Sequence, residues 1–140
     1  MSFTAEYVDD GRGLLFRGEG ALTCEQIIAA KLGLLSDPAR LRGVFHATVL
    51  FERVTDIPLT ADDIRRIVGA DRQLARLTPH VVVAIAADTD LPFGVARMWQ
   101  MLSEDIGWMT SVFRSRSQAE LWLQERLAVL AAVPGGVSRT

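Results

Sequence analysis

Few side chains in this sequence combine reactive chemistry with a position that could form a site. The acid–base candidates are His46, inside an apolar stretch, and Arg17, in an earlier one. Histidine titrates near neutral pH, so His46 could act as a general acid or base. No recognisable motif places a nucleophile beside it, and His80 is remote in sequence. A hydrogen-bonded structural histidine is therefore favoured, because buried polar groups are normally satisfied, and we expect no enzymatic activity.

Nucleophiles and metal ligands are sparse as well. Cys24 is the only cysteine, so no intrachain disulfide can form. It lies in the first turn of an expected helix, where we interpret it as a buried small residue. The two histidines and the cysteine stand on separate elements, without the spacing of a metal site. We therefore expect neither a metal nor another cofactor.

The richest apolar surface belongs to an expected helix over 92–106. We predict that four of its residues bind a ligand: Phe93, Arg97, Trp99 and Met101. Met and Trp are common at adaptable binding surfaces, and Arg97 could anchor an anionic head group. The alternative is packing in the core or against another subunit, with Arg97 in a salt bridge. The sequence alone leaves these two alternatives open.

Composition limits the classes of function. The chain has 140 residues, of which 49% are hydrophobic, and we expect one domain over 1–131 followed by a tail over 132–140. Its net charge of −2 is mixed along the chain, which disfavours nucleic-acid binding. No apolar run approaches the roughly 20 residues of a membrane-spanning helix. A cytoplasmic location is the default expectation for such a chain.

The elements that would position these residues alternate between strands and helices. Two stretches, 44–51 and 81–87, are apolar on both faces, as central strands covered by helices are. Further strands are expected over 2–8, 14–19 and 108–113, and helices over 24–35, 60–77, 92–106 and after Ser115. Pro38 is expected to end the first helix, and 52–59 is expected to be a loop.

This pattern predicts an α/β domain with the order β-β-α-β-α-β-α-β-α. The turn at 9–13 makes the first two strands an antiparallel hairpin. The later strands, separated by helices, predict a mostly parallel five-stranded sheet with one antiparallel edge strand and helices packed on it. Thr23 with Gln26 predicts a capping box at the first helix.

The element order resembles that of STAS-like domains, named for sulfate transporters and anti-sigma factor antagonists. In detail the chain is most similar to a bacterial branch of mostly uncharacterised STAS-like proteins. The stretches that carry the resemblance are 18–23, 54–57, 92–101, 112–115 and 119–123. The resemblance implies a STAS-like fold.

Thr60 is the position that the resemblance singles out. Anti-sigma factor antagonists are phosphorylated on a serine at the start of the helix after the third strand, in an Asp-Ser-Ser-Gly-type motif. The matching segment here is Pro58–Ala61, in which Thr60 stands at the position of the phosphorylated serine. The motif's aspartate, first serine and glycine are replaced by Pro58, Leu59 and Ala61. A helix N-terminus favours a phosphate, whereas Asp62 and Asp63 would repel it. A plain helix cap is the alternative.

The leading hypothesis is a non-enzymatic STAS-like module that binds a small apolar or amphipathic, lipid-like ligand or a protein partner. The alternative is a phospho-regulated switch with Thr60 as acceptor. The exposed hairpin edge and the apolar helix also make a homodimer plausible, since two-fold dimers are the commonest assemblies.

Overall fold

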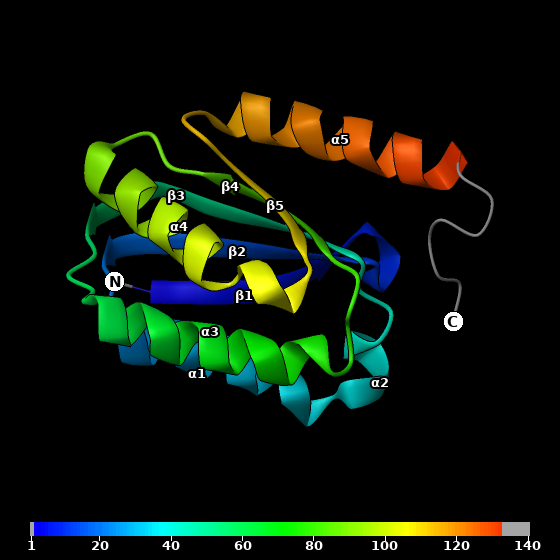
Figure 1. The fold of residues 1–140 in the computed structure, drawn as a ribbon, viewed down its shortest axis with the longest axis horizontal. Coiled ribbons are helices and arrows are strands. Elements are labelled where there is room, and N and C mark those ends of the chain that lie inside the picture. The colour runs from blue at the N-terminus through cyan, green and yellow to red at the C-terminus, as the bar shows by residue number, and fades with distance from the viewer. Residues whose placement is uncertain (1, 133–140) are drawn as a thin grey trace.

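Five strands form one mixed sheet in the computed structural model, which describes residues 2–132 (Figure 1). They are β1 (Ser2–Val8), β2 (Gly13–Ala21), β3 (His46–Asp56), β4 (Val82–Ala86) and β5 (Met109–Phe113). Their order in the sheet is their order in the chain. β1 pairs with β2 antiparallel, and every later pair is parallel. The predicted α/β class, with one antiparallel edge strand on a parallel sheet, is confirmed.

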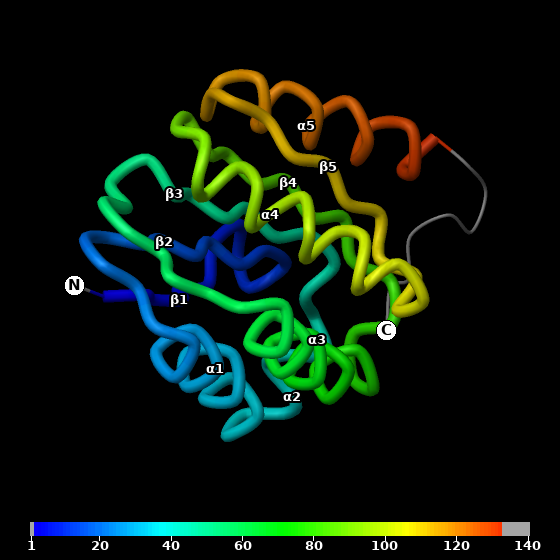
Figure 2. Tube along the Cα trace, turned by 60° about the vertical axis from the view of Figure 1, so that its left-hand side comes forward, coloured from blue at the N-terminus to red at the C-terminus, as the bar shows by residue number. Residues whose placement is uncertain are grey.

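Helices cover the two faces of the sheet unequally (Figure 2). Three long helices, α1 (Cys24–Gly33), α3 (Ala61–Ala75) and α4 (Asp90–Leu102), pack on one face. The last helix, α5 (Arg116–Ala132), packs on the other. A short helix, α2 (Pro38–Leu41), lies between α1 and β3 in the chain. The sheet therefore contributes to a large core under three helices and a small core under α5.

The central strands β3 and β4 contribute alternate side chains to the two cores. In β3, Ala47 and Val49 face the three helices, whereas Leu50 faces α5. β4 divides in the same way, with Val83 and Ile85 on the first side and Val82, Ala84 and Ala86 on the second. Successive strand residues point to opposite faces, so a strand covered on both sides must be apolar throughout. This explains the continuous apolar runs from which the central strands were predicted.

The structure differs from the prediction at two connections. Pro38 does end the first helical region, but it also begins α2, because the Asp37 side chain accepts a hydrogen bond from the Arg40 amide at 3.3 Å. β3 continues to Asp56, through much of the expected loop over 52–59, because it still pairs with the end of β2 there. Of the predicted tail, Ala132 ends α5 and residues 133–140 lie outside the described part of the chain.

The β1–β2 connection depends on the missing side chain of Gly13. His46 of the adjacent strand lies directly over this glycine, where a Cβ atom would stand 2.1 Å from His46 Cε1. The turn before it places Asp9 and Asp10 at φ values of 53° and 54°. Such left-handed conformations are unfavourable for residues other than glycine, although Asp tolerates them better than most. The close contact between Gly13 and the His46 ring thus lies next to the strained turn at Asp9 and Asp10.

Gly13→Ala is expected to destabilise the protein by about 1–3 kcal/mol, because the new methyl group and the His46 ring cannot occupy the same space. The matched control is Gly94→Ala in α4, where an added Cβ meets nothing within 4 Å. That substitution should leave stability unchanged or raise it by about 0.5–1 kcal/mol through helix propensity. Urea unfolding followed by circular dichroism measures both. Equal stabilities of the two variants would contradict the proposed packing.

Candidate functional site

A cavity of about 80 Å³ lies between the sheet and the three helices α1, α3 and α4. Its wall consists of aliphatic and aromatic side chains together with Lys31, Asp71 and Thr78. The site is thus an apolar space with one charged pair in its wall. Binding sites for small molecules commonly combine an apolar lining with a few well-placed polar groups.

Lys31 and Asp71 form a buried ion pair in this wall. Lys31 Nζ lies 2.6 Å from Asp71 Oδ1, and the Trp99 indole Nε1 donates to Asp71 Oδ2 at 2.7 Å. The side chain of Asp71 is 0% exposed and that of Lys31 is 11% exposed. Lys31 Nζ also lies 5.4 Å from the Phe16 ring centroid and 5.7 Å from that of Trp99. Each helix of the layer contributes one of the three polar partners.

Helical periodicity places this pair inside. Asp71 belongs to the buried stripe of α3, which also contains Ile64, Ile67, Val68 and Leu74. Lys31 shares the buried face of α1 with Ile27. Sequence reasoning missed the pair as a site, although a signal was present. Each of two helices carries a single charge on its apolar face, and Lys31 is the only lysine of the chain.

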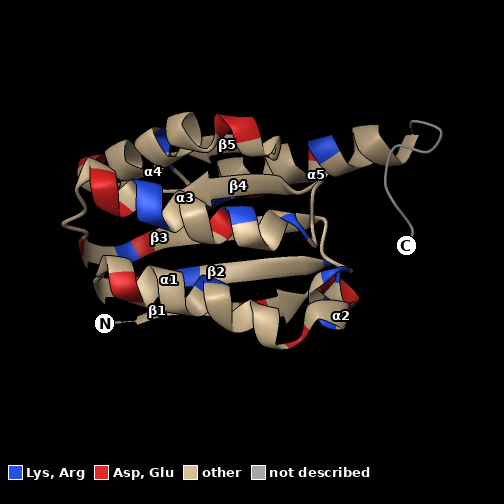
Figure 3. Cartoon of the chain, turned by 60° about the horizontal axis from the view of Figure 1, so that its bottom comes forward, with Lys and Arg blue, Asp and Glu red and all other residues tan. Residues whose placement is uncertain are grey.

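Ion pairs on the outer surface form a contrast to the buried one. Acidic and basic residues are interspersed along the exposed sides of these helices (Figure 3). Arg66 pairs with Glu25 at 3.1 Å, and Arg72 pairs with Asp105 at 2.6 Å. All four side chains are about half exposed or more, so water and salt screen these interactions.

The four residues predicted to bind a ligand do not share one pocket. Trp99 is buried and lines the cavity. Arg97 and Met101 are exposed, and Phe93 is half-buried beneath the Arg114 guanidinium, which lies 4.0 Å from its ring centroid. Residues 93, 97 and 101 follow one side of α4 at intervals of four, which leaves residue 99 on the opposite side. Of this set, only Trp99 is positioned to contact a molecule in the cavity.

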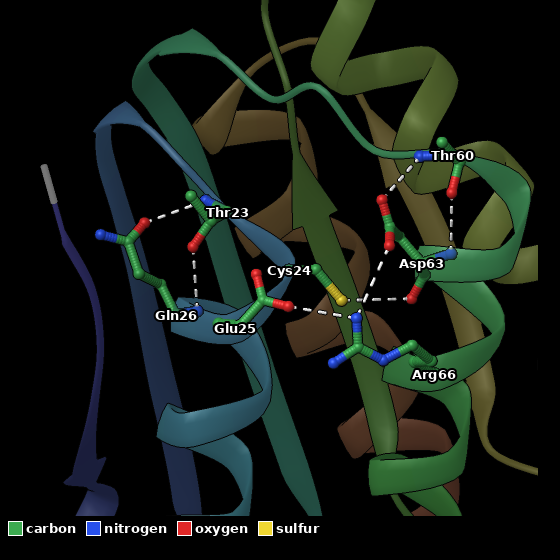
Figure 4. A network of polar contacts seen from close by, with 7 residues as sticks. All are labelled: Thr23, Cys24, Glu25, Gln26, Thr60, Asp63 and Arg66. Atoms are coloured by element: carbon green, nitrogen blue, oxygen red, sulfur yellow. Dashed lines mark hydrogen bonds and ion pairs between the residues drawn. The ribbon is translucent and has the colours of Figure 1, made fainter.

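Thr60 lies at the N-terminus of α3, next to the N-terminus of α1 (Figure 4). Its hydroxyl accepts from the Asp63 amide at 3.1 Å, and Asp63 Oδ2 accepts from the Thr60 amide at 3.0 Å. Thr60 is therefore an exposed residue in a complete capping box. The box predicted for Thr23 and Gln26 is also present, with bonds of 2.9 and 3.2 Å.

Cys24 lies between the two capping boxes. It is buried, and its thiol donates to the Asp63 carbonyl at 3.5 Å. Burial raises the pKa of the Cys24 thiol, which keeps it protonated and unreactive near neutral pH. The interpretation of this cysteine as a buried small residue agrees with its environment.

His46 and Arg17 do not form an acid–base site together. His46 Nε2 is hydrogen-bonded to Asp9 Oδ2 at 3.0 Å, and its Nδ1 is buried without a partner among residues 2–132. The bond from His46 is the main reason why the pKa of the Asp9 carboxyl is lowered. Arg17 is paired with Glu6 at 3.6 Å on the exposed hairpin. His46 thus holds the strained turn before β2, as a structural histidine would.

Comparison with solved structures identifies the fold. The anti-sigma factor antagonist SpoIIAA in its unphosphorylated form matches with a TM-score of 0.53 at 16% identity, covering 89% of this chain and 98% of the other. The Bacillus cell fate determinant SpoIIAA in its phosphorylated form gives 0.53 at 13% identity, covering 87% and 99%. An uncharacterized DUF3478-family protein from Shewanella loihica, with a SpoIIAA-like fold, gives 0.51 at 20% identity, covering 87% and 92%.

No protein-family model matches the sequence, and neither does any curated protein. The chain therefore has the SpoIIAA-like, or STAS-like, fold on structural likeness. Among residues 2–132, no three His, Cys, Asp or Glu side chains are grouped as metal ligands would be. Within the same range, none of the helices has the length and apolarity needed to cross a bilayer.

Lys31→Met is expected to lower the free energy of unfolding by roughly 3 kcal/mol, because Asp71 would keep a buried charge without its cation. The double variant Lys31→Met/Asp71→Asn should recover a large part of this loss, because it removes both charges together. Arg72→Met is the matched control, since it breaks the exposed pair with Asp105. Its effect should be much smaller. Urea unfolding of the wild type and the three variants measures these differences, and equal losses for Lys31→Met and Arg72→Met would contradict a special role of the buried pair.

Proposed function

We propose that this STAS-like domain is a non-enzymatic module that binds a small apolar or amphipathic ligand in the cavity beneath α1, α3 and α4. The observation that carries the proposal is the combination of an apolar cavity with a buried ion pair in its wall. A cavity needs only about 10–15 Å³ to hold one water, and an apolar cavity of about 150 Å³ binds benzene. At about 80 Å³, this cavity suits a compact ligand or the end of a longer one.

The arrangement of reactive groups supports binding rather than catalysis. His46, Cys24 and Thr60, the side chains with acid–base or nucleophilic chemistry that the sequence singled out, are absent from the cavity wall. Within the wall, the ionisable side chains are Lys31 and Asp71, which are bonded to each other. A nucleophile with a base and an orienting group is therefore not assembled there. A ligand would therefore be recognised by its shape and by a polar contact with the Lys31–Asp71 pair.

Isopentane is expected to bind in the cavity of the wild-type protein with a millimolar dissociation constant, in keeping with its few heavy atoms. Ala96→Met should abolish or strongly weaken this binding, because Ala96 is 2% exposed and lines the cavity. Ala61→Met places the same side chain at an exposed position of α3 and should bind isopentane like the wild type. Methyl-region NMR spectra during titration measure all three.

The same variants extend the test to the natural ligand. Native mass spectrometry of protein purified from its own cells should show an additional bound mass in the wild type and Ala61→Met but not in Ala96→Met. If isopentane shifts the resonances of the wild type and of Ala96→Met equally, it does not bind in the cavity.

A second function, a phosphorylation-controlled protein interaction, is favoured by the position of Thr60. Thr60 is exposed at the helix that follows the third strand, in a fold shared with SpoIIAA, of which a phosphorylated form is known. A protein partner would then contact the outer surface. Exposed apolar side chains for such a contact, or for a second copy of the chain, lie on α4 at Leu91, Met98 and Met101.

If Thr60 is the acceptor, incubation with ATP and an extract of the producing cells should add one phosphoryl group to the wild type. Thr60→Ala should remain unmodified. Thr23→Ala is the matched control, because Thr23 caps α1 as Thr60 caps α3, so both variants lose a similar cap, worth about 1 kcal/mol. Intact-mass spectrometry reports the product. A phosphoryl group on Thr60→Ala, or none on the wild type, would rule out this second function.

A further inference from the structure

The polar groups of the cavity wall differ in the hydrogen bonds that they have left to make. Thr78 donates its hydroxyl to the Leu74 carbonyl at 3.0 Å, and Trp108 donates its indole N–H to the Thr78 carbonyl at 2.8 Å. Each oxygen of Asp71 already accepts one hydrogen bond, from Lys31 and from Trp99. The O–H and N–H donors of these groups are thus engaged within the protein, whereas each Asp71 oxygen keeps a second lone pair.

Lys31 is the exception. An ammonium group has three N–H donors, and within residues 2–132 the Nζ atom of Lys31 has one hydrogen-bond acceptor, Asp71 Oδ1. Its other neighbours are the rings of Phe16 and Trp99, which also line the cavity. A cation–π contact offsets part of the lost hydration but does not provide a lone pair. The unused N–H donors of the cavity wall are therefore on Lys31 Nζ, and a ligand oxygen is the group that would accept from them.

Charge narrows the ligand class further. The Lys31–Asp71 pair is balanced, so a carboxylate in the cavity would leave a net negative charge in an apolar space. An amine would bring a second cation against the Lys31 ammonium. Burial of an uncompensated ion costs several kcal/mol, whereas an uncharged oxygen acceptor avoids that cost. A carbonyl or ether oxygen accepts a hydrogen bond from a charged donor and adds no charge.

We propose that the cavity binds a compact, uncharged ligand, of the class of small ketones, esters and lactones, whose oxygen accepts a hydrogen bond from Lys31 Nζ. The inference rests on the proposed ligand-binding function and specifies its chemistry. Asp71 and Trp99 are positioning residues in this arrangement. They hold the ammonium at the wall and do not contact the ligand oxygen themselves.

The test uses four probes of similar size on the wild-type protein: butanone, isopentane, isobutyrate and sec-butylamine. Because Lys31 is the only lysine, labelling with ¹⁵N-lysine produces a single side-chain Nζ resonance. Butanone should shift this resonance saturably, whereas isopentane should shift methyl resonances of the cavity and leave Nζ nearly unmoved. Isobutyrate and sec-butylamine should bind at least about tenfold more weakly than butanone, as expected for an uncompensated charge.

Lys31→Met/Asp71→Asn tests the hydrogen bond in a protein without the buried charges. Its affinity for butanone should fall about tenfold or more, the size expected for losing a hydrogen bond to a charged group. Its affinity for isopentane should be unchanged or higher. A circular dichroism spectrum like that of the wild type verifies its fold. If the variant does not fold, the Nζ titration of the wild type still decides the question.

The outcomes separate the two proposals. Isopentane binding without a butanone-induced Nζ shift would overturn the selection of an oxygen acceptor and leave the ligand-binding function standing. Tighter binding of isobutyrate than of butanone would overturn the requirement for an uncharged ligand. Failure of all four probes to bind would overturn both the ligand class and the proposed function.

Discussion

The contact between Lys31 and Asp71 is the interaction around which one whole layer of this protein is arranged. It joins α1 to α3, and the Trp99 indole joins α4 to the same carboxylate. Two charges taken out of water are tolerated only when their partners are close and well oriented. The pair therefore constrains how the three helices lie relative to one another. It also places a charged group beside a space that is lined mostly by hydrocarbon.

The opposite face of the sheet is covered in a simpler way. α5 alone covers it, against the small side chains Ala84 and Ala86, and its own Ala119 is fully buried there. Small residues let a helix approach a sheet closely, so this layer is filled by direct contact. The three-helix layer holds larger side chains, and the cavity occurs there.

Much of the fold was predictable because its signals are local. The central strands are apolar on both faces, and the hairpin turn and the Thr23 capping box depend on residues within a few positions of each other. The candidate site was not predictable in the same way. Lys31 and Asp71 are 40 residues apart, and nothing in the spacing of either helix specifies the other as its partner.

The ligand prediction on the fourth helix shows the same limit. The composition of α4 indicated an unusually apolar helix. The rotation of α4 about its axis determines that Trp99 faces the cavity while Arg97 and Met101 face solvent. That rotation is set by Ala96 and Trp99 packing against the large core. Pro38 shows a related limit, because it ends the first helical region as predicted but also begins α2. Whether a proline ends one helix or begins the next depends on the side chain before it, here the capping Asp37.

The order of the strands has a consequence for how the chain is made. Because each strand pairs with the one before it in the sequence, the sheet grows at one edge only as residues are added. A chain leaving the ribosome can add each new strand to a surface that already exists, without opening an earlier pair or waiting for a later one. Each pair joins strands that are consecutive in the sequence, which limits the sequence separation of the contacts and favours rapid folding. Lys31 and Asp71 both lie on helices that precede β4, β5 and α5 in the sequence.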